Sequence, residues 1–186
     1  MPYREYFVPA MDGRLALESR FRDVEFAVYL AMVFLAPFFL GHLWQGILDQ
    51  FVVGSIVNCF LALGALYLGM KKVLPLILLP SIAAFLTGIV FGPQSLFLLY
   101  LIPFIWVGNA IFVYAIKLLK VARGSNYALS LAWAAAGKSL FLLIASFALF
   151  SLSIIPVQFL FAMGLLQFAT ALTGGAMAGT IYILRR

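Results

Sequence analysis

Residues 127–150 read YALSLAWAAAGKSLFLLIASFALF, and Lys138 is the one charged residue in this apolar run. The run is long enough to cross a membrane as a helix, because about 20 residues span the hydrocarbon layer of a bilayer. At ~1.5 Å per helical residue, Lys138 lies roughly 16 Å from the start of the run, near the middle of the layer. A cation at that depth costs about 2.5–3.5 kcal/mol on insertion scales. We therefore expect a specific partner that offsets this cost.

The whole chain has the composition of an integral membrane protein. It has 186 residues, of which 66% are apolar and 10% are charged, whereas soluble domains carry about 25% charged residues. No polar stretch is long enough for a second globular domain, so we expect one membrane domain. The net charge of +6 comes from basic residues at the ends of apolar runs. This placement favours a topology signal and lipid headgroup contact over nucleic-acid binding.

Six apolar segments predict an all-α protein with six transmembrane helices. The charged residues 1–25 precede them and predict an amphipathic segment on the cytoplasmic membrane surface. Residues 26–186 then form the transmembrane domain. Within it, the helices are expected near residues 26–44, 52–70, 73–91, 95–117, 127–150 and 157–184.

The positions of the basic residues predict the orientation of these helices. Eleven of the twelve lysines and arginines lie in the tails and in alternate connections, and Lys138 is the exception. The other three connections, at residues 45–51, 92–94 and 151–156, carry Asp49 as their one charge. By the positive-inside rule, both termini of this multi-pass protein are expected on the cytoplasmic side of the cell membrane.

The counts of cysteine and histidine exclude several kinds of cofactor site. Cys59 is the only cysteine and His42 the only histidine. One cysteine allows no intrachain disulfide, no cysteine-held iron–sulfur cluster and no cysteine-rich zinc site. We therefore expect no cofactor, no metal site and no catalytic residue, and we expect that the protein is not an enzyme.

Few strongly polar side chains remain inside the predicted helices. Asn109 and the pair Gln167 and Thr170 are expected near the depth of Lys138, whereas Asn58 is expected only about 9 Å from the outer end of its helix. Trp106, one turn before Asn109, would either pack against a ligand or belong to the core. The predicted substrate-binding residues are therefore Lys138, Asn109, Gln167, Asn58, Thr170 and Trp106.

The partner of Lys138 stays open at this point, because the predicted helices contain no aspartate or glutamate. The remaining options are an uncharged lysine, a cage of carbonyls and amides, an acidic residue of a partner subunit, or an anionic ligand. The leading hypothesis is a solute-binding transport subunit. The alternative is a structural or assembly subunit in which Lys138 pairs with another chain. A lipid-modifying enzyme is disfavoured, because the helices lack the acidic and histidine ligands of such metal sites.

Five stretches of the chain resemble a known family of prokaryotic membrane proteins. The family groups with the substrate-binding S components of energy-coupling-factor (ECF) transporters, and the resemblance covers roughly residues 26–184. Some members of the most similar branch carry the label "iron hydrogenase", against which the single cysteine argues. The stretches are GSIVNCFL (54–61), LPSIAAFLTG (79–88), IPFIWVGNAI (102–111), AGKSLFL (136–142) and QFATALTGG (167–175).

The resemblance implies a six-helix protein with cytoplasmic termini that captures a vitamin-like or metal-related small solute from outside. It also implies partners, namely a transmembrane T component and two ATPases that power release of the solute. S components commonly dock through small residues of the first helix, and Ala27 and Ala31 match that spacing. The chain itself lacks a phosphate-binding loop, since Gly137-Lys138-Ser139 has no upstream glycine at the required position.

Overall fold

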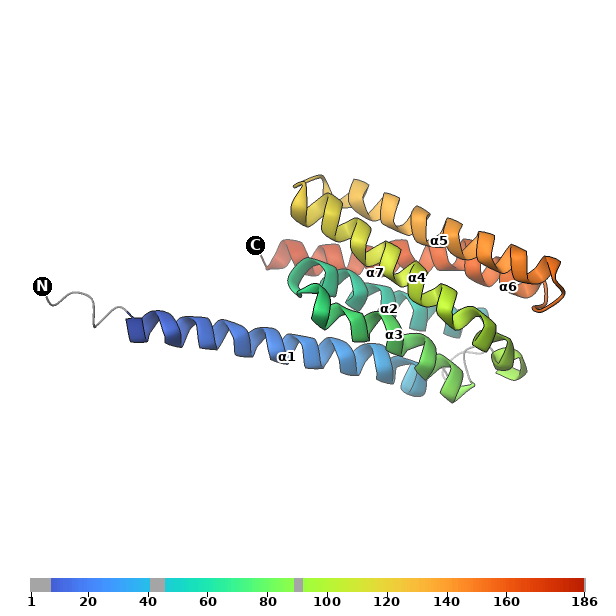
Figure 1. The fold of residues 1–186 in the computed structure, drawn as a ribbon, viewed down its shortest axis with the longest axis horizontal. Coiled ribbons are helices and arrows are strands. Elements are labelled where there is room, and N and C mark those ends of the chain that lie inside the picture. The colour runs from blue at the N-terminus through green and yellow to red at the C-terminus, as the bar shows by residue number, and fades with distance from the viewer. Residues whose placement is uncertain (1–7, 41–45, 89–91, 186) are drawn as a thin grey trace, which may run out of the picture.

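The computed structural model describes residues 8–40, 46–88 and 92–185, with side chains described from Arg20 onward except for Pro93. His42 and residues 1–7 lie outside the described residues. All described secondary structure is helical, and Figure 1 shows the helices packed side by side along a common direction. The α-helices are α1 (Val8–Leu40), α2 (Ile47–Tyr67), α3 (Met70–Thr87), α4 (Leu98–Ile116), α5 (Tyr127–Ser151), α6 (Gln158–Phe161) and α7 (Gln167–Leu184).

Three shorter helical segments extend or join these helices. The 3₁₀-helix η1 (Gly92–Phe97) leads into α4, and the π-helix η2 (Lys117–Ala122) continues it. The π-helix η3 (Ala162–Leu166) joins α6 to α7. Together these elements give six segments that are long and apolar enough to cross a membrane: Arg20–Leu40, Ile47–Tyr67, Met70–Thr87, Gln94–Ala122, Tyr127–Ser151 and Gln158–Leu184. The prediction of an all-α protein with six helices that are long and apolar enough to cross a membrane is confirmed for the described residues.

The second and third spans begin earlier than the sequence predicted, at residues 47 and 70 rather than at 52 and 73. Two glycines explain the second and third starts. Gly46 precedes α2 with a φ of 76°, a left-handed conformation that glycine adopts without strain. Leu68 and Gly69 are extended and form the short turn between α2 and α3. This turn lies inside a continuous apolar run, so hydropathy alone does not reveal it.

Helix α1 is continuous across the boundary that the sequence suggested at residue 25. Its 33 residues correspond to about 50 Å at 1.5 Å per residue, which exceeds the ~30 Å hydrocarbon layer. Figure 1 shows its N-terminal part projecting beyond the other helices. The charged segment and the first span therefore belong to one helix.

Helix α2 lies at the centre of the bundle and contacts α1, α3, α4 and α7. Its closest approach is to α7 at Gly174, where a Cβ would lie 2.1 Å from the carbonyl oxygen of Ser55. Gly175 and Gly179 pack instead against α5, through Leu131 and Tyr127. Small residues therefore bring α7 close to both α2 and α5, as membrane helix interfaces commonly require.

Basic residues mark one end of the bundle, which we call the basic end and define by Lys72, Lys117 and Arg185. Lys72 forms an ion pair with Asp23 of α1, and Arg185 pairs with Glu25 at 2.6 Å. Lys117 Nζ donates to the carbonyl oxygens of Ala65 at 2.9 Å and Leu68 at 2.5 Å, which satisfies acceptors at the C-terminus of α2. Gly46, η1 and the connection between α5 and α6 lie at the opposite end.

Candidate functional site

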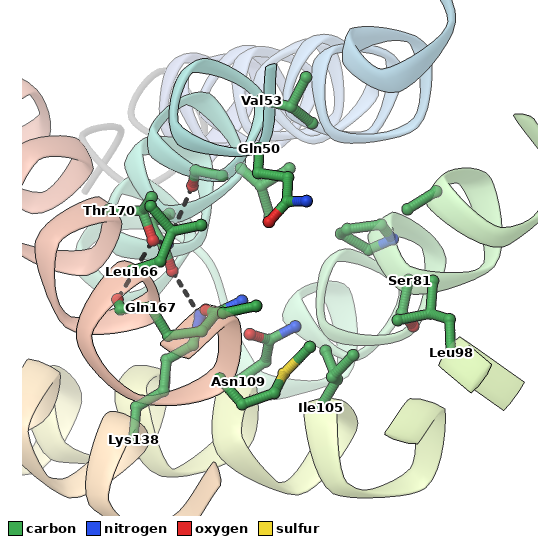
Figure 2. A pocket seen from close by; sticks show the side chains of 17 residues that line it. Gln50, Val53, Ser81, Leu98, Ile105, Asn109, Lys138, Leu166, Gln167 and Thr170 are labelled. Atoms are coloured by element: carbon green, nitrogen blue, oxygen red, sulfur yellow. Dashed lines mark hydrogen bonds between the residues drawn. The ribbon is translucent and has the colours of Figure 1, made fainter. Parts of the chain in front are cut away.

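A cavity of about 80 Å³, which we call the inner cavity, lies among α2, α3, α4, α5 and the sixth span. No described residue of α1 lines it. Five of the six residues predicted from the sequence line this cavity, namely Lys138, Asn58, Asn109, Gln167 and Thr170. Figure 2 shows Asn109 of α4, Lys138 of α5 and the pair Gln167 and Thr170 of α7 around a common space. The other lining residues are Gln50, Val53, Gly54, Val57, Pro80, Ser81, Ala84, Leu98, Ile105, Ala162, Met163 and Leu166.

The side chain of Lys138 is buried, with only 2% of its surface exposed. Its Nζ donates to Asn58 Oδ1 at 2.7 Å and lies 5.6 Å from the centre of the Phe112 ring. An ammonium group carries three donors, and an aromatic face stabilises a cation without accepting a conventional hydrogen bond. Among the described residues, Asn58 Oδ1 is the one acceptor within hydrogen-bond distance of this nitrogen. The ammonium therefore retains capacity for another acceptor.

Asn58 connects the lysine to α7. Its Nδ2 donates to Gly54 O at 2.9 Å and to Thr170 Oγ1 at 3.2 Å, and Thr170 Oγ1 donates to Gln167 O at 3.1 Å. A backbone carbonyl only accepts, so Gly54 O requires the NH₂ group on its side and leaves Oδ1 facing Lys138. The network has one consistent direction, from the ammonium through the amide and the hydroxyl to a backbone carbonyl.

Asn109 lies on the α4 side of the cavity and is 2% exposed. Its Nδ2 donates to Ile77 O of α3 at 3.1 Å, so the amide fixes α4 against α3. The remaining oxygen of the side chain is an acceptor at the cavity. Figure 2 shows Asn109 beside Lys138, with Gln50 facing them from α2.

Trp106 does not line the cavity. Its indole Nε1 donates to Leu78 O at 3.0 Å and to Ser81 Oγ at 2.9 Å. Ser81 does line the cavity, so Trp106 supports the site from behind by positioning α3. Ala27 and Ala31, the predicted docking residues, are exposed on α1 and lie apart from the cavity.

A second cavity of about 320 Å³ adjoins the first at the end of the bundle opposite the basic end. The two cavities share Gln50 and Ala162 as lining residues. Gln50, Gln94 and Gln158 contribute side-chain amides to the second cavity. The sequence prediction missed these glutamines because they lie near span ends. All three glutamines lie in or next to the connections that carry no basic residue, and this shared position could have identified them.

A π-helix shapes the wall of both cavities. The segment η3 (Ala162–Leu166) interrupts the sixth span, and its Ala162, Met163 and Leu166 line the inner cavity. A π-helical turn contains extra residues, so it changes the direction in which the following side chains point, and such turns occur frequently at functional sites. Sequence periodicity did not reveal this interruption.

The electrostatic character of the inner cavity depends on one group. None of its described lining residues is acidic, and Lys138 is the one basic residue among them. In the sequence, every aspartate and glutamate precedes residue 50. A buried cation without a counter-ion is costly, so the cavity suits an anion or a ligand rich in acceptors.

We expect Asn58→Leu alone to destabilise the protein by about 2–3 kcal/mol, because it leaves the buried ammonium without its acceptor. Lys138→Met in the same chain should recover part of this loss, with a coupling energy of about 1–3 kcal/mol. Unfolding by SDS in mixed micelles measures all four members of this double-mutant cycle. The distant pair Asn58→Leu and Lys71→Met is the control and should be additive. Additivity of Asn58→Leu with Lys138→Met would contradict the assigned network.

Comparisons of the chain with protein-family models, with curated proteins and with solved structures found no match, so the site is interpreted from its own geometry.

Proposed function

We propose that this protein is the membrane-embedded, solute-binding subunit of an importer, similar to an ECF S component. The observation that carries the proposal is the position of Lys138. A buried ammonium faces a cavity inside the bundle, and the second cavity continues this space to one end. Binding energy for a captured solute would come from satisfying this cation, in a site already formed by five helical segments.

The arrangement favours this function over that of a structural or assembly subunit. In the alternative, Lys138 would pair with an acidic residue from another chain. Such a residue would have to cross the outer surface of the bundle, because Lys138 is only 2% exposed and its Nζ faces inward. A solute would instead approach Lys138 from the second cavity, which shares Gln50 and Ala162 with the first.

The orientation and partners belong to the same proposal. The chain would lie in the cell membrane with both termini and the basic end in the cytoplasm, as the positive-inside rule favours. The second cavity would then open to the outside. Ala27 and Ala31, exposed on α1, are the proposed docking residues for a T component, which two ATPases would drive.

Native mass spectrometry of the protein extracted from its own membranes tests the function. We expect one small molecule to be retained by the wild-type protein. A bound protein chain with an acidic membrane segment, in place of a small molecule, would favour the assembly subunit. Lys71→Met, which removes an exposed lysine, is the control for a general effect of charge and should retain the small molecule.

Labelling of single cysteines tests the orientation. In a Cys59→Ser background, Gln158→Cys should react with a membrane-impermeant maleimide on intact cells, whereas Arg123→Cys should react only after permeabilisation. Both positions are exposed, and they lie at opposite ends of the bundle. The reverse pattern would place the basic end outside and would refute the proposed direction of solute capture.

A further inference from the structure

The two adjoining cavities differ in size and in lining, and this difference indicates the chemical class of the solute. We propose that the site takes a compact monocarboxylate. The carboxylate would occupy the inner cavity against Lys138, and an uncharged, hydrogen-bonding body would occupy the second cavity. This inference rests on the proposed function and makes it specific.

Size separates the two parts of the ligand. One buried water needs about 10–15 Å³ of cavity volume. The 80 Å³ of the inner cavity therefore holds on the order of five waters. This space suits a carboxylate with one or two carbons. The second cavity, at about 320 Å³, reaches the range of roughly 300–1,000 Å³ that is typical of small-molecule sites. The body of the solute therefore belongs there, with Gln50 and Ala162 at the junction.

Charge determines the head group. Protonated Lys138 contributes one positive charge, and no other described lining residue of the inner cavity is ionisable. A carboxylate carries one negative charge and neutralises the site, as a buried charge requires. A phosphate carries about −1.5 to −2 at neutral pH and would leave excess negative charge beside the amides. A cationic solute would add to the charge of Lys138 and is excluded.

Hydrogen-bonding capacity supports the same head group. The Nζ of Lys138 already donates to Asn58 Oδ1, and its remaining donors can reach carboxylate oxygens in the cavity. The side chains of Gln50 and Gln167 also line the cavity, and each carries an NH₂ group with two donors. One carboxylate, with two oxygens that each accept more than one hydrogen bond, can take the donors of Lys138, Gln50 and Gln167.

The second cavity recognises an uncharged body. The polar side chains among its described lining residues are those of Gln50, Gln94 and Gln158, and no described lining residue is charged. Each carboxamide offers both a donor and an acceptor, so the matching groups on a solute are amides, hydroxyls or ring nitrogens. Phe159 and Phe161 provide apolar surface beside them.

A matched series of three probes tests the class of solute. N-benzoylglycine has a carboxylate on one carbon, an amide and a ring. N-benzoylglycinamide replaces the carboxylate with a neutral amide, and N-benzoylaminomethylphosphonate replaces it with a phosphonate. Titration calorimetry on the full chain in lipid nanodiscs, with probes up to millimolar concentration, should show binding of the carboxylate. The other two probes should bind about tenfold more weakly or worse.

Three variants connect the result to the proposed contacts. Lys138→Met should reduce the affinity for the carboxylate to that for the amide. Gln158→Leu should reduce the affinities for the carboxylate and for the amide by the same factor, because it alters only the second cavity. Lys71 lies outside both cavities, so Lys71→Met should leave the affinity for each probe unchanged.

Equal affinity for the carboxylate and the amide, tighter binding of the phosphonate, or no binding of any probe would overturn the assignment of a monocarboxylate. Native mass spectrometry then separates the two proposals. If a molecule without a carboxylate is retained by the wild-type protein, solute binding stands and only the chemical class is wrong. If no molecule is retained and no probe binds, both proposals are wrong.

Discussion

Replacing Gly174 with valine is expected to destabilise the six-helix bundle by about 3 kcal/mol or more. A Cβ at this position would lie 2.1 Å from Ser55 O, 2.7 Å from Cys59 N and 2.9 Å from Asn58 Cβ. The first two contacts are with the backbone of α2, which cannot move aside as a flexible side chain would. Overpacking typically costs about 1–3 kcal/mol, and a backbone obstacle puts this substitution at or above the upper end. We expect a lower yield of folded protein and an earlier midpoint in SDS unfolding.

A series of glycine substitutions provides the control. Gly69→Ala should leave the midpoint unchanged within error, since a Cβ at Gly69 meets no atom within 4 Å. Gly54→Ala should be intermediate, because its Cβ would lie 3.0 Å from the side chain of Thr170. If Gly174→Val unfolds at the same SDS concentration as Gly69→Ala, then α2 and α7 do not pack as described.

Replacing Lys138 with methionine is expected to abolish retention of the small molecule while leaving the bundle folded. The substitution keeps most of the volume of the lysine stem and removes the ammonium, so it creates little empty space. A hydrogen bond to a charged group contributes about 1.5–3 kcal/mol, which corresponds to roughly tenfold to hundredfold in affinity. Native mass spectrometry of the variant measures the loss, and thermal unfolding in detergent checks the fold.

The energetic balance of Lys138→Met distinguishes binding from structure. The variant removes the cost of a buried charge but leaves Asn58 Oδ1 without its donor, so we expect a net change in stability within about 1–2 kcal/mol. Unfolding of the variant under conditions in which the wild-type protein is stable would identify Lys138 as a structural residue. Normal retention of the molecule by a folded variant would exclude it from the site.

The sequence predicted the helices well because hydropathy reports what the bilayer requires. It predicted helix ends less well, and this error affected the site. Asn58 was expected at a shallower depth than Lys138 because α2 was placed from residue 52. With α2 starting at Ile47 and α5 at Tyr127, each residue lies eleven positions into its helix (58 − 47 and 138 − 127). The two helices start at opposite ends of the bundle, so each residue lies about 16 Å from its own end, near the middle of a ~30 Å layer. They therefore meet at the same level, where they form the 2.7 Å hydrogen bond.

Other features of the site depend on contacts between helices, which the spacing along one helix does not contain. Trp106 illustrates this, because its spacing from Asn109 fitted both a ligand contact and a core position. Its donor reaches Leu78 and Ser81 on α3 instead of the cavity. Gln94 of η1 and Gln158 of α6 are the opposite case. They are far apart in the sequence, yet both line the second cavity. Composition identified polar residues, but only packing determined which of them share a space.

If the protein takes up a solute as proposed, the ring of Phe112 has a wider consequence for how that solute would cross. It is fully buried, lies under the ammonium of Lys138 one turn beyond Asn109, and is followed toward the basic end by the equally buried Ile116. Among the described residues, the cavity is therefore cup-shaped. It is closed by hydrophobic side chains toward the basic end and continues into the second cavity at the other end. A cavity closed on one side can hold a solute without opening a path for ions, so the membrane stays impermeable to ions while the site is loaded. Under the proposed function, delivery to the other side would then require the helices to part or the whole cup to turn over.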